Sequence, residues 1–263
     1  MLGAIFGDIV GSSYEFNNVK TTDFPLFTVD SFATDDSVMT LALAEALMKS
    51  DIRADIDNFK RIFVACMHDY GDRYPTAGYG GNFAAWLTYH DTEPYGSYGN
   101  GSAMRVSPVA WYAESLEEAI RFAAASSEVT HDHPEGIKGA VCTSGAVYLA
   151  RTGANKETIR RFVEGYYDIA FTLDEIRPSY TFKEICQDTV PQAMVAFLES
   201  ESFEDCIRLA ISIGGDSDTI AAMAGAVAEA YYGMSEEETE AIRRYLDEDQ
   251  LHVLDCFRES FID

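Results

Sequence analysis

The sequence predicts an all-α fold with roughly ten or more helices joined by long loops. Three observations lead to this class. No segment of any length alternates apolar and polar residues with the period of two that is typical of strands. Apolar residues instead recur at steps of three and four, as on one face of a helix. Signals that start or end helices flank these runs, so we expect helices over residues 3–12, 38–48, 56–70, 83–89, 115–125, 134–150, 155–167, 191–198, 203–210, 219–232, 235–246 and 251–257.

The first expected helix carries a glycine at every fourth position, Gly3, Gly7 and Gly11. On a helix this spacing makes a ridge without side chains, where a neighbouring backbone can come close. Glycines weaken a helix, so tight packing must offset them. The helix should end near Ser12, which leaves Glu15 just beyond its last turn.

The second expected helix begins with a cluster of polar residues. Thr34 is a good N-cap, and Asp35 and Asp36 occupy the first turn, where free backbone N–H groups and the helix dipole favour negative charge. Leucine, alanine and methionine dominate residues 38–48, which indicates a buried helix. Residues 56–70 follow as an amphipathic helix.

The middle of the chain is rich in loops. Residues 71–101 combine many glycines and tyrosines around one short helix, a composition typical of loops that line a ligand cleft. Ser115 with Glu118 is a capping-box signature for the next helix. Pro134 suits the first turn of the helix that runs to residue 150. Apolar spacing alone predicts most of the later helices.

The helix expected over residues 219–232 presents small residues on nearly every face. Such a helix can be surrounded closely on all sides and belongs at the centre of the protein. We infer that the ridge of Gly3, Gly7 and Gly11 packs against it. That contact would bring Glu15 to the acidic residues at the start of this helix.

Length and composition limit the protein class. The 263 residues can bury one sizeable core and show no linker, so we expect a single domain over residues 1–263. The formal net charge of −25 argues against nucleic acid or an anionic membrane as a partner. Five scattered cysteines do not indicate a disulfide framework, and the apolar N-terminus lacks a basic leader. We therefore expect a cytoplasmic protein.

Two acidic clusters stand out, residues 34–37 (Thr-Asp-Asp-Ser) and residues 213–219 (Ile-Gly-Gly-Asp-Ser-Asp-Thr). Together they offer four aspartates and two threonines, the oxygen ligands that Mg²⁺ and Mn²⁺ prefer. If the clusters meet, they form a divalent-cation site. The alternative is that each is only an acidic helix start, a common arrangement. An EF-hand loop starting at Asp216 is excluded, because Ala221 and Val227 stand where glycine and glutamate are required.

Five motifs occur in an order that resembles the ADP-ribosylglycohydrolase family: Gly7-Asp8 with Glu15, residues 34–37, residues 99–105 (Gly-Asn-Gly-Ser-Ala-Met-Arg), Thr130-His131 and residues 214–219. The resemblance spans residues 3 to about 233. It implies an orthogonal all-α bundle with a dinuclear Mg²⁺ or Mn²⁺ centre at the foot of a cleft. Residues 155–200 carry no matching motif.

The resemblance also implies roles for single residues. It assigns Glu15 to the cleft as catalytic glutamate, Asn100, Gly101 and Ser102 to the loop that binds the ADP-ribose diphosphate, and His131 to substrate positioning. The implied metal ligands are Thr34, Asp35, Asp36, Asp216, Asp218 and Thr219. Asp8 and Arg105 also match, and for each we expect a structural role, as part of a buried ion pair or as a cap.

The implied reaction is metal-dependent hydrolysis of the N- or O-glycosidic bond between ADP-ribose and an acceptor. Glu15 is the expected general base, with Asp35 or Asp36 sharing that role. The substrate would be an ADP-ribosylated protein side chain, such as arginine or serine, or a small ADP-ribose conjugate. Two alternatives stay open: a dinuclear hydrolase of a free ADP-ribose conjugate or nucleotide, and a non-catalytic ADP-ribose-binding protein.

Overall fold

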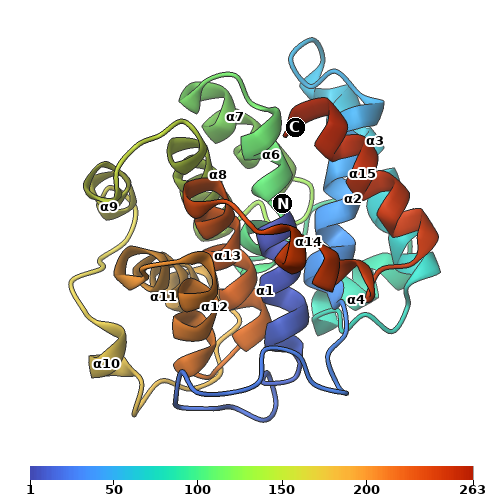
Figure 1. Cartoon of the computed structure of the whole chain (residues 1–263). Coiled ribbons are helices and arrows are strands. Elements are labelled where there is room, and N and C mark those ends of the chain that lie inside the picture. Colours follow the sequence, from blue (N-terminus) through green and yellow to red (C-terminus); the bar gives the residue numbers. More distant parts are fainter. Residues whose placement is uncertain (263) are drawn as a thin grey trace.

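The computed structural model describes residues 1–262, which form fifteen α-helices and, apart from one isolated bridge between Gly99 and Ile185, no β-structure. The predicted all-α class is confirmed (Figure 1). The helices are α1 Leu2–Ser12, α2 Asp35–Lys49, α3 Ile56–Arg73, α4 Gly81–Thr88, α5 Gly101–Met104, α6 Ser107–Tyr112, α7 Leu116–Ser127, α8 Pro134–Arg151, α9 Lys156–Glu164, α10 Leu173–Ile176, α11 Cys186–Glu199, α12 Phe203–Ser212, α13 Ser217–Tyr232, α14 Glu236–Arg243 and α15 Glu248–Phe261.

Helices α1 and α13 lie side by side at the centre of the protein, as the glycine ridge predicts (Figure 1). Every residue of α1 is buried. A Cβ atom at Gly3 would lie 2.2 Å from the carbonyl oxygen of Gly225, and one at Gly7 would lie 2.1 Å from that of Ala221. Real Cβ atoms do not approach so closely, so only glycine allows the two backbones to touch.

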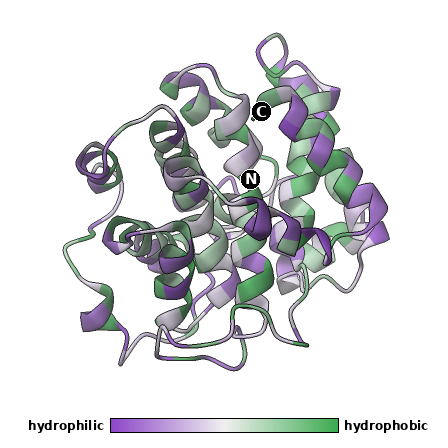
Figure 2. Ribbon diagram, in the orientation of Figure 1, coloured by the Kyte–Doolittle hydropathy of each residue, from purple (hydrophilic) through white to green (hydrophobic). Residues whose placement is uncertain are grey.

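The other helices enclose this central pair. α2, α11 and α12 pack against α1 or α13, and α8 packs against α13 on one side and α7 on the other. Helices at the periphery turn polar residues outward, and Figure 2 shows this most clearly for α9 and α10. The central pair therefore fixes where the starts of α2 and α13 lie, and these starts carry the two acidic clusters.

Several predicted helix starts are confirmed. Thr34 caps α2 by accepting a hydrogen bond from the backbone N–H of Asp36, and Pro134 lies in the first turn of α8. Ser115 caps α7 by accepting from the backbone N–H of Glu118. The Glu118 carboxylate accepts from the backbone N–H of Glu114, so the reciprocal half of the expected capping box is absent there.

Two predictions about helix starts are wrong. The helix expected from Thr219 begins at Ser217, two residues earlier, and the Thr219 hydroxyl donates to Asp36 Oδ2. The helix expected from Pro191 begins at Cys186, five residues earlier, so Pro191 lies inside α11. Backbone contacts to the loop at residues 98–99 hold the start of α11, and these lie beyond the reach of local signals.

Three short helices, α5, α6 and α10, were not predicted, because four to six residues carry too little periodicity.

All five cysteines are free thiols, as expected. Within residues 1–262, none of the helices is both long and apolar enough to span a bilayer. The single domain stays a prediction.

Candidate active site

The second acidic cluster is delivered by a sharp turn between α12 and α13. Gly214 and Gly215 have φ angles of 68° and 79°, a region that favours glycine. A Cβ at Gly215 would also lie 2.5 Å from the ring of Tyr180, so the turn has no room for a side chain. The turn directs Asp216 and Asp218 into the protein, where both are buried.

The first acidic cluster is anchored to α1 through Asp8. The Asp8 carboxylate accepts hydrogen bonds from the backbone N–H of Thr34 at 3.0 Å, from the Thr34 hydroxyl at 2.6 Å and from the backbone N–H of Ser37 at 3.1 Å. It also accepts from the Ser37 hydroxyl. Of the two structural roles expected for Asp8, the structure shows the cap. Asp8 therefore links the central helix to the start of α2.

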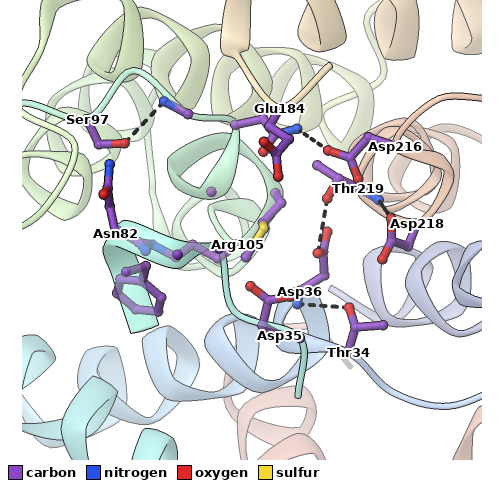
Figure 3. A pocket seen from close by; sticks show the side chains of 18 of the residues that line it. Thr34, Asp35, Asp36, Asn82, Ser97, Arg105, Glu184, Asp216, Asp218 and Thr219 are labelled. Atoms are coloured by element: carbon purple, nitrogen blue, oxygen red, sulfur yellow. Dashed lines mark hydrogen bonds between the residues drawn. The ribbon is translucent and has the colours of Figure 1, made fainter. Parts of the chain in front are cut away.

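The two clusters meet in space, although 180 or so residues separate them in the sequence. The Thr219 hydroxyl donates to Asp36 Oδ2 at 3.1 Å, an interaction that Figure 3 shows between the facing side chains. Carboxylate oxygens of Asp8, Asp36 and Asp218 lie within 4.8 Å of one another, and so do those of Glu15, Asp216 and Asp218. Asp218 belongs to both groups, so the groups are adjacent.

The electrostatics of these groups favour a bound cation. Burial, with Asp218 close by, raises the pKa of Asp8 to about 7. Burial, with the charges of Asp218 and Asp35, raises the pKa of Glu15 to about 8. Burial and then Asp218 also raise the pKa of Asp36 well above its ordinary value. Ionised carboxylates this close repel one another unless protons or cations compensate them.

The buried oxygen atom Asp36 Oδ1 shows that a metal ion fits between the carboxylates. Asp36 Oδ1 has no hydrogen-bond partner among the described residues, although buried carboxylate oxygens are normally paired. It stands in a set that offers only oxygen donors, which is the preference of hard divalent cations. Asp35 lies on the same helix start and faces the cleft (Figure 3). The residues present therefore fit Mg²⁺ or Mn²⁺.

Glu15 is held in place by a residue that we did not predict, Asn18. The Asn18 amide nitrogen donates to the backbone carbonyl oxygens of Tyr14 at 2.7 Å, Glu15 at 2.8 Å and Gly215 at 3.0 Å. Its oxygen accepts from the backbone N–H of Gly215 at 2.7 Å. One side chain therefore joins the Glu15 segment to the turn that carries Asp216. No local sequence signal reveals a contact that spans 197 residues.

A cleft of about 590 Å³ opens above the carboxylates, a size typical of small-molecule sites. It is lined by both acidic clusters, Glu15, Asn100, Gly101 and His131, together with Phe16, Phe32, Ala77, Gly78, Gly80, Gly81, Asn82, Phe83, Tyr95, Gly96, Ser97, Tyr98, Gly99, Met104, Arg105, Phe182, Glu184 and Ile185. The structure thus brings together all but one of the predicted site residues.

The glycine-rich loop at residues 96–101 forms one wall of the cleft and is tied to the acidic floor. The Asn100 amide nitrogen donates to Asp216 Oδ2 at 2.6 Å, and the backbone N–H of Asn100 donates to the carbonyl oxygen of Glu184 at 2.9 Å. A Cβ at Gly101 would lie 3.0 Å from His131 Nε2. Glycine at this position therefore keeps the loop against the histidine.

Ser102 is the predicted site residue that does not line the cleft. Its side chain is buried, and its hydroxyl donates to the carbonyl oxygen of Gly136 at 2.8 Å. The Ser102 hydroxyl is therefore bonded away from the cleft, and the place of Ser102 in the diphosphate-binding loop stays a prediction. The helix α5 turns this side chain toward α8, a direction that the motif alone does not specify.

His131 is neutral and is held in one orientation. Burial and then the charge of Arg105 lower its pKa well below the ordinary value. The Thr130 hydroxyl accepts from Arg105 Nη2 at 2.8 Å and lies 2.8 Å from His131 Nδ1. In the tautomer in which this hydroxyl donates its hydrogen to Nδ1, the ring hydrogen lies on Nε2, beside Gly101. His131 can donate a hydrogen bond into the cleft but is a poor proton acceptor.

Of the two structural roles expected for Arg105, the structure shows the cap position and not the ion pair. Arg105 is buried, is the C-cap residue of α5, and makes no ion pair among residues 1–262. Its guanidinium carbon instead lies 5.4 Å from the ring centre of Phe63 and 5.8 Å from that of Phe83, while one nitrogen orients Thr130. The aromatic faces take the place of the anion that we expected.

Sequence reasoning also missed Phe182 and Glu184, which lie in the stretch without a recognisable motif. The bridge between Gly99 and Ile185, with the hydrogen bond from Cys186 N–H to the Tyr98 carbonyl, brings this stretch to the cleft. Such pairing depends on the folded arrangement of α5 and α11, so the sequence offers no direct signal for it.

The fold and the site together define a class: an all-α protein with a cluster of carboxylates at the foot of a nucleotide-sized cleft. The model of the ADP-ribosylglycohydrolase family matches residues 1–258. The chain belongs to the ADP-ribosylglycohydrolase family and is an enzyme that hydrolyses a glycosidic bond of ADP-ribose.

Individual relatives agree with this membership. The chain is 28% identical to the ADP-ribosylhydrolase ARH3 of Mus musculus, covering 90% of this chain and 83% of the relative, and equally identical to that of Homo sapiens. It is 27% identical to the ADP-ribosylarginine hydrolase Tri1 of Pseudomonas putida, over 89% and 70% of the two chains. A solved structure described as an ADP-ribosylglycohydrolase-related protein complex shares the fold, with a TM-score of 0.65 at 23% identity and coverage of 99% and 97%.

Proposed function

We propose that this enzyme depends on two divalent cations, Mg²⁺ or Mn²⁺, bound between the starts of α2 and α13. The observation that supports this most is the pair of adjacent carboxylate groups that share Asp218 at the foot of the cleft. The proposed ligands are those that the sequence predicted, Thr34, Asp35, Asp36, Asp216, Asp218 and Thr219. Asp8 supports them from behind by fixing Thr34.

The proposed substrate is ADP-ribose joined to an acceptor, either a protein side chain such as arginine or serine or a small molecule. When bound, the cations would polarise the ribose hydroxyls and favour ionisation of water. Glu15 takes the proton of the attacking water, and the Asp35 and Asp36 carboxylates stabilise the positive charge that develops on the sugar ring. Glu15 is suited to this role because it is half-buried at the cleft and fixed by Asn18.

The remaining cleft residues position the substrate. The His131 Nε2–H group and the loop that carries Asn100 and Gly101 face the same space, so we propose that they hold the diphosphate and the ribose next to it. Water adds to the anomeric carbon, the bond from this carbon to the acceptor breaks, and the acceptor atom takes a proton. We further propose that the protein works in the cytoplasm.

The test is to measure release of ADP-ribose by the purified protein from ADP-ribosylated peptides and from free ADP-ribose conjugates, with Mg²⁺, with Mn²⁺ and with EDTA. We expect release that EDTA abolishes and that either cation restores. Full release in EDTA would overturn the metal dependence, and no release from any conjugate would overturn the proposed substrate class.

A further inference from the structure

The turn at residues 214–215, which carries Asp216, is held by two side chains from the loop after α1 (Figure 1). Asn18 bonds to the backbone N–H and carbonyl groups of the second glycine. Lys20 bonds to the residue before the glycines, because its Nζ donates to the carbonyl oxygen of Ile213. Lys20 does not line the cleft, so contact with substrate does not explain its place.

The Lys20 ammonium lies directly against the turn. A Cβ at Gly214 would lie 3.0 Å from Lys20 Nζ and 3.0 Å from Asn18 Oδ1, so the two side chains occupy the space that glycine leaves open. Ile213 is the C-cap of α12, where free carbonyl groups and the helix dipole favour a cation. The hydrogen bond from Lys20 is therefore charge-assisted, at the point where the main chain leaves the helix.

Residues 174–181 also pack against this turn, and we call them the supporting segment. The ring of Tyr180 lies beside Gly215, where a Cβ would be 2.5 Å from it. Arg177 Nε donates to the hydroxyl of Ser212, the last residue of α12, at 3.0 Å. The supporting segment belongs to the stretch of the chain that carries no recognisable motif, so these contacts give part of that stretch a place in the site.

Lys20 joins the supporting segment to the turn. Its Nζ donates to the carbonyl oxygen of Tyr180 at 2.7 Å as well as to that of Ile213, across 160 and 193 residues of sequence. Burial and then the charge of Arg177 lower the pKa of Lys20 from its ordinary value, so a second cation stands near the end of α12. One ammonium therefore links three parts of the chain at the point that leads into the second acidic cluster.

We infer that Lys20 is a positioning residue, which fixes the turn so that Asp216 is presented to the proposed cations. The inference rests on the proposed function, in which Asp216 is a ligand. The Asn100 amide nitrogen holds Asp216 Oδ2 from the cleft side at 2.6 Å, and Lys20 holds the main chain just before it. Metal ligands must stay within about 0.5 Å of their productive positions, so release of the main chain here weakens cation binding and slows the reaction.

The chain offers a matched comparison for Lys20 in Lys156. Lys156 Nζ donates to the carbonyl oxygen of Leu198 at 3.1 Å and to that of Ser200, the C-cap of α11. It therefore bonds two carbonyl groups at a helix end, as Lys20 does, but it does not line the cleft and lies on another helix end. Loss of the Lys156 ammonium should cost stability without moving Asp216.

The experiment compares Lys20→Met, Lys20→Arg and Lys156→Met in the intact protein. It measures Mn²⁺ affinity by calorimetry, and kcat and KM at saturating Mn²⁺ for release of ADP-ribose from an ADP-ribosylated peptide that the wild type cleaves. Lys20→Met should weaken Mn²⁺ binding and lower kcat about tenfold each, with KM within about threefold. Lys20→Arg keeps a cation with donors and should stay within about threefold of the wild type, and Lys156→Met within about twofold.

Four results would overturn this inference alone. Lys20→Met could match the wild type in Mn²⁺ affinity and kcat, or Lys156→Met could lose as much as Lys20→Met, which would make Lys20 a general stabiliser. Lys20→Arg could be as weak as Lys20→Met, which would remove the role of the charge. Circular dichroism could show Lys20→Met unfolded while Lys156→Met is folded. A wild type that neither binds Mn²⁺ nor releases ADP-ribose would instead overturn the proposed function, and this inference with it.

Discussion

Replacing Gly11 by alanine should damage both the stability of the protein and its affinity for divalent cations. A Cβ at position 11 would lie 2.4 Å from the Cα and 2.6 Å from the backbone nitrogen of Asp218. Ordinary contact begins at 3.4 Å, so α1 and α13 must separate by about 1 Å at this level. The atoms that resist are backbone atoms of a buried helix and cannot rotate away.

The expected magnitudes follow from this displacement. Overpacking of this kind costs about 1–3 kcal/mol, and the helix propensity gained from alanine returns at most about 1 kcal/mol. We expect the free energy of unfolding to fall by about 2 kcal/mol in urea titrations with EDTA present. Because Asp218 belongs to both carboxylate groups, its shift should also weaken Mn²⁺ binding about tenfold or more, measured by calorimetry.

Gly71→Ala is the matched control for Gly11→Ala. Gly71 also lies within a helix, but the three atoms nearest to a Cβ there belong to the Leu87 side chain: its two terminal carbons, at 2.9 and 3.0 Å, and its Cγ, at 3.3 Å. That side chain can rotate, so we expect a change in stability below about 0.5 kcal/mol and unchanged Mn²⁺ affinity. If Gly11→Ala proves as stable as the wild type and binds Mn²⁺ equally well, the close contact of α1 with α13 does not position the site.

Four further predictions concern the site itself. Asp218→Asn should weaken Mn²⁺ binding at least tenfold by calorimetry and abolish turnover; unchanged affinity would contradict the assignment of this ligand. Glu15→Gln should leave Mn²⁺ affinity within about threefold but lower kcat about a hundredfold or more, and full activity would remove Glu15 from the chemistry. Asn18→Ala should lower kcat about tenfold and also weaken Mn²⁺ binding, since it frees both the Glu15 segment and the turn that carries Asp216; a change in KM alone would argue for a different role. Without metal, Asp8 and Glu15 have pKa values of about 7 and 8 in the folded protein, above their ordinary 3.8 and 4.5. The folded state therefore holds more protons than the unfolded state, and the free energy of unfolding should fall as pH rises from about 4 to 8. Mg²⁺ should reduce this slope, and a rise in stability over that range in EDTA would refute the pKa directions.

Local sequence signals predicted the elements that determine the fold. The four-residue spacing of Gly3, Gly7 and Gly11 was enough to place α1 against the small-residue helix α13, because a side-chain-free ridge has few other uses. The cap at Thr34 was equally clear, since a hydroxyl and two acids at a helix start satisfy free backbone N–H groups. These features depend on residues that lie close together in the chain.

Contacts between distant segments could not be predicted in this way. Asn18 acts on Gly215 across 197 residues, and Glu184 reaches the cleft because its segment pairs with the loop at Asn100. Ser102 sits in a motif that suggested contact with substrate, but the direction of its side chain depends on where α8 lies. Composition and periodicity carry no information on such directions until the helices are packed.

In our proposal the two acidic clusters form one dinuclear metal site. The most direct measurement is a crystal structure of the protein with Mn²⁺ and ADP-ribose, with anomalous differences collected for manganese. We predict two anomalous peaks about 3.5–4 Å apart, between Asp36 and Asp218, with the ribose beside Glu15. Bound ADP-ribose with no manganese peak between these residues would contradict it.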